Sequence, residues 1–207
     1  MTPARPSSAV LGFRPHTYWT AAVALAGRPG APRVLERRRI VFAAGEERSV
    51  YHYAAEAEPV RAASWIEAVR AATKANAVRE IGELLADLQR DGVSVRIAAV
   101  PAGTAKLPGK LEDILRVHAL MHAAEGTFYR DVVASACGAL GLEVLRIIER
   151  DTPSRMCTLL GIDKSSLETR LKDMGATLGP PWSEDYKLAT QAAWLCLEDT
   201  RARPVRA

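Results

Sequence analysis

Just after the first apolar run of the chain lie two residues whose side chains are suited to binding phosphate. Arg14 and His16 directly follow the apolar residues 9–13. A guanidinium group matches the geometry of a phosphate with two parallel hydrogen bonds. The alternative is an exposed turn that carries ordinary charges. The sequence therefore marks Arg14 and His16 as candidate phosphate contacts.

Four carboxylates at the ends of predicted elements are candidate metal ligands. Glu149 and Asp151 follow the last predicted strand, and Glu184 and Asp185 open the last predicted helix. Mg²⁺ and Mn²⁺ prefer oxygen ligands, so these four residues could hold such an ion if the fold brought them together. Carboxylates that end strands also serve as solvent contacts or helix caps, and the position of Asp151 before Thr-Pro is typical of a cap.

A histidine pair on a predicted helix offers a second kind of ligand. His118 and His122 are four residues apart, and Glu125 follows three residues later. This spacing places all three on one helix face, which could present them to a metal ion. His118 also lies in an apolar stripe with Leu115 and Met121, and the sequence shows no third or fourth ligand. The pattern therefore favours histidines that pack against the core or cap the helix.

The densest positive stretch contains Arg37, Arg38 and Arg39. On a strand, alternation places Arg37 and Arg39 on one face and Arg38 on the other, so the three do not form one patch. Charged residues of this kind protect the exposed edge of a sheet. We therefore expect an edge strand here.

Composition indicates a globular chain with a packed core. Of 207 residues, 48% are hydrophobic and 25% are charged, and the formal net charge is +4. A mildly basic balance is compatible with nucleic-acid binding without requiring it. Cys137, Cys157 and Cys196 are odd in number and have apolar neighbours, which indicates reduced, buried thiols. The chain shows neither a signal peptide nor an apolar run approaching the length of a membrane span, so we expect a cytoplasmic protein and no membrane partner.

Apolar periodicity predicts five strands. They cover residues 9–13, 20–26, 34–42, 93–100 and 142–148. The first three are separated only by short turns, which favours antiparallel pairing. Residues 93–100 are rich in β-branched residues, as expected of a buried central strand. Residues 43–60 are expected to be irregular.

The remaining segments have helical periodicity. Ser64, three residues before Glu67, has the spacing of a helix N-terminus, and Gly92 ends that region, which holds one or two helices. Residues 111–140 form a long helical stretch that Gly126 could break. Further helices are expected at residues 154–160, 165–174 and 183–197.

This order of elements predicts one α/β domain. Three antiparallel strands followed by helix-linked parallel strands give a mixed five-stranded sheet with helices on both faces. We place the domain at residues 9–199, with disordered tails at residues 1–8 and 200–207.

Two sequence motifs, together with the order of the predicted strands and helices, indicate a resemblance to a known family. Residues 11–16 read Leu-Gly-Phe-Arg-Pro-His and are followed by the second predicted strand, and residues 184–194 read Glu-Asp-Tyr-Lys-Leu-Ala-Thr-Gln-Ala-Ala-Trp. Order and motifs together resemble the ribonuclease H-like superfamily, and in detail its bacterial Holliday-junction resolvases. In that branch the first strand carries Leu-Gly-Ile-Asp-Pro-Gly, and the last helix bears paired aspartates ahead of an alanine-rich run. The resemblance covers roughly residues 9–197.

The resemblance implies a nuclease site that has lost its ligands. Enzymes of this kind use two divalent ions, about 3.5 to 4 Å apart, held by carboxylates. Arg14 stands at the position of the first-strand aspartate, and residues 100–102 offer no carboxylate where the family places a glutamate. Lys187 stands at the position of one of the two acids of the last helix. A fixed cation repels a metal ion, so the resemblance implies a pseudo-nuclease.

Three hypotheses follow. The leading one is a catalytically inactive ribonuclease H-like domain, without a metal cofactor, that binds DNA or RNA or a partner protein; its phosphate-facing residues would be Arg14, His16, Lys106, Lys110 and Lys187. The second is a nuclease that uses Mg²⁺ or Mn²⁺ on relocated carboxylates, Glu149, Asp151, Glu184 and Asp185. The third is a structural or assembly module, such as the homodimer of the resembled resolvases.

Overall fold

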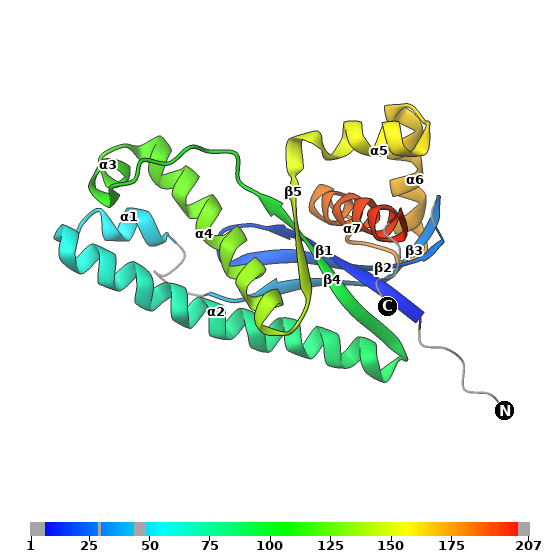
Figure 1. Cartoon of the computed structure of the whole chain (residues 1–207), viewed down its shortest axis with the longest axis horizontal. Helices are drawn as coiled ribbons and strands as arrows, with labels where there is room; N and C mark the ends of the chain where they lie inside the picture. Colours follow the sequence, from blue (N-terminus) through cyan, green and yellow to red (C-terminus); the bar gives the residue numbers. More distant parts are fainter. Residues whose placement is uncertain (1–6, 29, 44–48, 203–207) are drawn as a thin grey trace.

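A mixed five-stranded sheet forms the centre of the molecule (Figure 1). The structure is a computed structural model that describes residues 7–28, 30–43 and 49–202. The strand order is β3-β2-β1-β4-β5. β1 pairs antiparallel with β2, which pairs antiparallel with β3, whereas β1, β4 and β5 are parallel. The predicted mixed sheet is therefore confirmed. The strands are β1 (Ser7–Pro15), β2 (Trp19–Arg28), β3 (Ala31–Val41), β4 (Val93–Ala102) and β5 (Glu143–Ile148).

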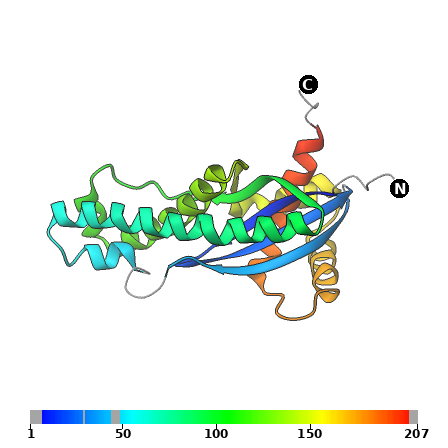
Figure 2. The same cartoon turned by 90° about the horizontal axis from the view of Figure 1, so that it is seen from below.

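Helices cover both faces of the sheet, as predicted. They are α1 (Val50–Ala54), α2 (Pro59–Arg90), α3 (Leu111–Leu115), α4 (His118–Ala139), α5 (Thr152–Leu160), α6 (Lys164–Ala176) and α7 (Glu184–Ala202), with a 3-10 turn, η2 (Glu149–Asp151), after β5. One hydrophobic cluster joins one face of the sheet to α1, α2 and α4. A second cluster joins the other face to α5, α6 and α7. Figure 2 shows that α2 extends past the strands, toward α1.

The apolar runs of β1 and β2 follow from burial on both sides. Leu11 and Phe13 belong to the cluster of α2 and α4, whereas Val10 belongs to the cluster of α7. Because successive side chains of a strand point to opposite faces, a strand covered on both sides is apolar at every position. This is why periodicity located these strands within a few residues.

The expected edge strand is β3, which lies at the end of the sheet. Arg37 and Arg38 of this strand contact opposite sides of the sheet, as alternation predicts. Arg38 donates to Asp87 of α2 at 2.8 Å, whereas Arg37 donates to the carbonyls of Gly179 at 2.7 Å and Pro180 at 2.9 Å, in the loop before α7. The arginines therefore anchor segments on both sides of the sheet edge.

Three local expectations were wrong. Residues 50–54, within the segment expected to be irregular, form α1, which buries Val50 and Ala54. The helix expected to start at Ser64 begins at Pro59 as the single helix α2, because proline suits the first helical position and Glu58 is extended before it. The break in the stretch 111–140 falls between α3 and α4, where Val117 has extended backbone angles, and not at Gly126.

The predicted tails lie mostly outside the described residues, which omit 1–6 and 203–207. Ser7 and Ser8 belong to β1, and residues 200–202 continue α7. The structure buries Cys137 and Cys196 and leaves Cys157 half-buried. Burial raises the pKa of the Cys137 thiol to about 12. In the described part of the chain, every helix is too short or too polar to cross a membrane.

Helix α7 approaches the sheet most closely at Gly12 of β1. A Cβ atom at Gly12 would lie 1.9 Å from the carbonyl oxygen of Ala189 and 2.9 Å from the Cβ of Ala193. Only a residue without a side chain allows this contact between helix and strand backbones.

Substitution of this glycine tests the contact. We expect Gly12→Ala to lower the free energy of unfolding by about 3 kcal/mol, because the backbone of α7 must move to make room. Urea denaturation measures the change. Gly138→Ala is the matched control: Gly138 is exposed on α4 with nothing near its Cβ position, and alanine should stabilise that helix by about 0.5 to 1 kcal/mol. Equal effects at the two positions would contradict the contact.

Candidate functional site

The carboxyl ends of three parallel strands lie along one edge of the sheet. β1, β4 and β5 pair in parallel, with Gly12 beside Ala99 and Ala102 beside Ile148. Strand ends of parallel sheets are where α/β proteins commonly bind ligands. We call this region, from the end of β1 to η2, the carboxyl edge.

An ion pair joins the ends of β1 and β5 at this edge. Nε of Arg14 lies 3.1 Å from Oε2 of Glu149, and the two side chains are only 20% and 27% exposed. Both atoms are buried, and they are not aligned as a hydrogen bond. The contact is therefore a close electrostatic one, in which a guanidinium neutralises the carboxylate beside it.

A second guanidinium, that of Arg130 on α4, lies near the same carboxylate. The pKa of Arg130 is below its ordinary value, chiefly because burial disfavours the charged form. Glu149 opposes that shift, whereas Arg14 and Arg146 add to it. An arginine nevertheless stays charged at neutral pH. Its Nε is buried without a hydrogen-bond partner among the described residues, and the residue also lines a cavity.

A cavity opens beside this group of charges. Its volume is about 420 Å³, and it lies among the loop after β4, the first half of α4 and η2. Its polar lining residues are Thr104, His122, Thr127, Arg130, Glu149 and Arg150. Two arginines and one glutamate give the lining an excess of positive charge, and two hydroxyl groups add hydrogen bonds. A phosphate group has the charge and the acceptor oxygens that such a lining binds.

Arg14 and His16, which were considered together in the sequence, contact different partners: Arg14 pairs with Glu149, and His16 pairs with Asp185. Nε2 of His16 lies 2.6 Å from Oδ1 of Asp185 at the start of α7. The His16 ring also stacks on Trp19, with ring centroids 4.4 Å apart and an interplanar angle of 8°. His16 thus connects the end of β1 to α7, next to the Arg14 ion pair.

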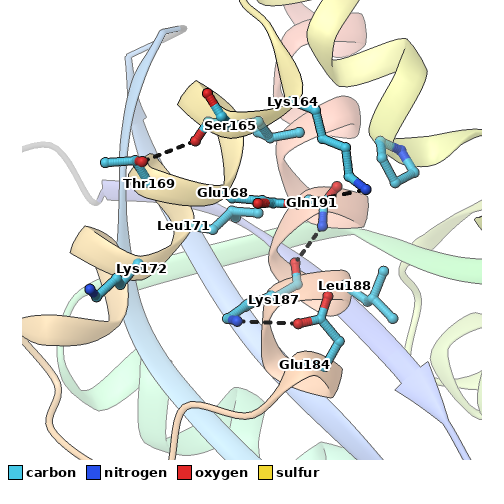
Figure 3. Close-up of a pocket in the computed structure, with 12 residues that line it drawn as sticks. Lys164, Ser165, Glu168, Thr169, Leu171, Lys172, Glu184, Lys187, Leu188 and Gln191 are labelled. Atoms are coloured by element: carbon cyan, nitrogen blue, oxygen red, sulfur yellow. Dashed lines mark hydrogen bonds and ion pairs between the residues drawn. The ribbon is translucent and has the colours of Figure 1, made fainter.

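The three lysines predicted to face phosphate lie elsewhere. Lys187 lines a different cavity, of about 470 Å³, among α5, α6 and α7, where its Nζ lies 3.2 Å from Oε2 of Glu184 (Figure 3). Lys106 and Lys110 are exposed on the segment between β4 and α3. The structure does not bring these three lysines into the cavity that Arg130 lines.

The four carboxylates considered as metal ligands each have a separate cation. Glu149 pairs with Arg14, and Asp185 pairs with His16. Asp151 pairs with Arg150, and Glu184 pairs with Lys187. Over residues 7–28, 30–43 and 49–202, no three of these carboxylates bring oxygens within 4.8 Å of one another. This arrangement does not fit a two-metal site, whose ions are about 3.5 to 4 Å apart and share ligands. Asp151 is the N-cap residue of α5, but its side chain makes no capping hydrogen bond.

Sequence reasoning missed Arg130 and Arg150. Arg130 comes four residues after Gly126, which was considered as a helix break. A Cβ at Gly126 would lie 2.9 Å from Nη1 of Arg130, so the glycine leaves room for the guanidinium to lie along the helix. A glycine four residues before an arginine on a helix could have indicated this arrangement. Arg150 carried no such signal.

Comparisons with known proteins give structural matches only. No family model matches the sequence, and no curated protein matches it. The chain is similar to Thermus thermophilus RuvC in complex with a Holliday junction substrate, with a TM-score of 0.49, 10% identity, and coverage of 94% of this chain and 96% of that chain. It is also similar to another structure of Thermus thermophilus RuvC, with a TM-score of 0.48, 13% identity and the same coverage.

The sheet of this chain defines its fold class. β1, β2 and β3 pair antiparallel, and β1, β4 and β5 pair in parallel, which is the mixed α/β sheet that the sequence led us to expect; the order across the sheet is β3-β2-β1-β4-β5. The final helix, α7, packs across β1 and β2, which completes that arrangement.

The Arg14 ion pair can be measured with a double-mutant cycle. We expect the free energies of unfolding of Arg14→Met, Glu149→Gln and the double variant to give a coupling energy of about 1 kcal/mol, because the contact is close and mostly shielded from water. Lys164 and Glu168 on exposed α6, 3.7 Å apart, are the control pair and should show no measurable coupling. Zero coupling between Arg14 and Glu149 would contradict the ion pair.

Proposed function

We propose that this ribonuclease H-like domain binds nucleic-acid phosphates at its carboxyl edge and does not cleave them. The observation that carries the proposal is the Arg14 guanidinium, 3.1 Å from Glu149, at the point where β1 and β5 end. A cation at that point satisfies the carboxylate that a metal ion would otherwise bind. A phosphate is then the complementary ligand for the arginines around it.

Arg130 would supply the principal phosphate contact. Its guanidinium is half-buried, lines the cavity and leaves Nε without a hydrogen-bond partner in the described chain. Burial strengthens an interaction with a charged ligand, because less water competes for it. Arg150 is more exposed and would add a weaker contact at the cavity rim.

His16 and the three lysines extend the proposed surface. His16 is half-buried against Asp185, so it would position the end of β1 more than it would hold a phosphate. Lys106 and Lys110 follow the cavity-lining residue Thr104 along the chain and are exposed. They would contact a nucleic acid long enough to extend beyond the cavity. Lys187 would contribute only if the bound strand also crossed the α6 and α7 cavity.

The two other hypotheses remain distinguishable from this one. Cleavage would require Mg²⁺ or Mn²⁺ to displace Arg14 or His16 from the carboxylates they contact. An assembly role, with a partner protein or a homodimer, would require a binding surface that does not depend on Arg130. Light scattering measures the oligomeric state independently of nucleic acid.

The experiment compares binding and cleavage on the same substrates. Fluorescently labelled four-way junction, linear duplex and single-stranded DNA and RNA are titrated with the protein in chelator, Mg²⁺ or Mn²⁺, with anisotropy as the binding signal and a denaturing gel as the cleavage signal. We expect salt-dependent binding without a metal ion and intact substrate in every case. The logarithm of the binding constant should fall with the logarithm of salt concentration by about 0.9 for each duplex phosphate neutralised.

Single variants assign the contacts. Arg130→Met should weaken binding and reduce the salt slope by about 1, because one phosphate contact is lost. Arg79→Met removes the same charge from an exposed position of α2 and is the matched control; it should leave the slope unchanged. Lys187→Met tests whether the surface reaches α6.

Three results would overturn the proposal. They are an affinity that does not change with salt, an equal loss in Arg79→Met and Arg130→Met, and cleavage that needs Mg²⁺ or Mn²⁺ and disappears in Glu149→Gln. The last result would establish the nuclease hypothesis.

A further inference from the structure

Three of the four histidines of the chain meet outside the sheet, between α1 and the start of α4. They are His52, His118 and His122, and one nitrogen of each lies within 4.8 Å of the others. α1 and the start of α4 lie beyond the ends of the strands, whereas the rest of α4 packs on the sheet (Figure 1). His118 and His122 are exposed, so of the two expected roles, packing against the core or capping the helix, the first was wrong.

The rings are oriented as ligands of a shared ion would be. Their centroids are 4.4 to 5.0 Å apart, and the interplanar angles are 55°, 79° and 89°. None of the three pairs is stacked face to face. Two nitrogens bound to one tetrahedral ion at about 2.1 Å are about 3.4 Å apart. Closing the observed separations of up to 4.8 Å to that spacing would require the side chains of the exposed His118 and His122 to rotate.

Glu125 fixes the orientation of His52. The Glu125 side chain is only 7% exposed, and its Oε1 lies 3.1 Å from Nδ1 of His52. The backbone N–H of Tyr51 donates to the same oxygen at 3.2 Å. When Nδ1–H donates to the carboxylate, the lone pair of the ring lies on Nε2. A carboxylate behind a ligating histidine is the usual outer partner in metal sites.

The remaining nitrogen of His52 lacks a partner. Nε2 of His52 is buried and makes no hydrogen bond within the described residues. A buried polar atom left in this way costs free energy unless something binds it. A metal ion held by the three imidazoles would satisfy it.

We propose that His52, His118 and His122 bind a divalent transition-metal ion, of which Zn²⁺ is the best match, with Glu125 positioning His52. Imidazole nitrogens are ligands that Zn²⁺ binds well, whereas Mg²⁺ prefers oxygen ligands. Three histidines leave one coordination position for water, as in zinc sites with three protein ligands. The ion would join α1, a helix of five residues, to α4.

The site is separate from the phosphate contacts proposed above and does not rest on them. It uses neither Arg14 nor Arg130. His122 also lines the cavity at the carboxyl edge, so the two sites are neighbours. A bound cation would add to the positive charge of that cavity.

The test uses the untagged full-length chain, freed of metal with a chelator and dialysed. Isothermal titration with Zn²⁺ should give one ion per chain, with a dissociation constant in the micromolar range or tighter. Co²⁺ should give the visible absorption of a tetrahedral complex. Zn²⁺ should also raise the thermal unfolding midpoint, because it binds the folded chain.

Four variants identify the ligands. His118→Ala and His122→Ala change exposed residues and should abolish Zn²⁺ binding with no loss of the metal-free fold, checked by circular dichroism. His52→Ala should do the same. Glu125→Gln keeps an oxygen acceptor for Tyr51 and should weaken binding by about 10- to 100-fold. His16→Asn, the remaining histidine, is the control and should bind Zn²⁺ as the unchanged protein does.

Three outcomes would overturn the proposal. The first is the absence of one-to-one Zn²⁺ binding in the folded, unchanged chain. The second is binding that survives loss of His118 or His122 in a folded variant, and the third is binding that is lost in a folded His16→Asn variant. The midpoint shift with Zn²⁺ must follow the same pattern across the variants.

Discussion

The backbone contact between α7 and β1 at Gly12 sets the geometry of the carboxyl edge. A Cβ there would lie 1.9 Å from the carbonyl of Ala189, so the helix lies directly on the strand. The contact fixes where α7 begins relative to the end of β1. As a result Asp185, in the first turn of α7, meets His16, two residues past Arg14, at 2.6 Å. A bulkier residue in β1 would lift α7 and separate these two side chains.

Charge at that edge differs from what a metal-dependent nuclease requires. Oxygen ligands must converge on shared ions and remain available to them. Here Glu149 is held by Arg14, and Asp185 is held by His16. Arg130 adds a half-buried positive charge, and its Nε has no hydrogen-bond partner among the residues that the structure describes. An edge with this balance is suited to a ligand that is itself an anion, which is why the phosphate proposal follows from geometry and not from the resemblance alone.

In the histidine cluster, the short helix α1 supplies a third possible metal ligand to the two histidines of the longer helix α4. The helix α4 presents His118, His122 and Glu125 on one face, but two ligands bind a metal ion weakly. The five-residue helix α1 adds His52 and turns Glu125 into its positioning partner. Tyr51, beside His52, donates its backbone N–H to the same carboxylate. The buried carboxyl group of Glu125 thus contacts two nitrogens of α1, the backbone N–H of Tyr51 and Nδ1 of His52.

The sequence by itself predicted where the five strands lie along the chain and that they form a mixed sheet; the order of the strands across the sheet came from the structure. Residues such as Leu11 and Phe13 are apolar because both faces of β1 are covered. The resulting apolar run lies in consecutive residues, so it can be recognised in the sequence. The sequence also predicted that β3 is an edge strand. Tertiary structure alone decided that Glu149 pairs with Arg14, that Lys187 lies in another cavity, and that His52 meets His118. These contacts join residues far apart in the chain, and neither spacing nor periodicity encodes which distant side chains a packed helix brings together.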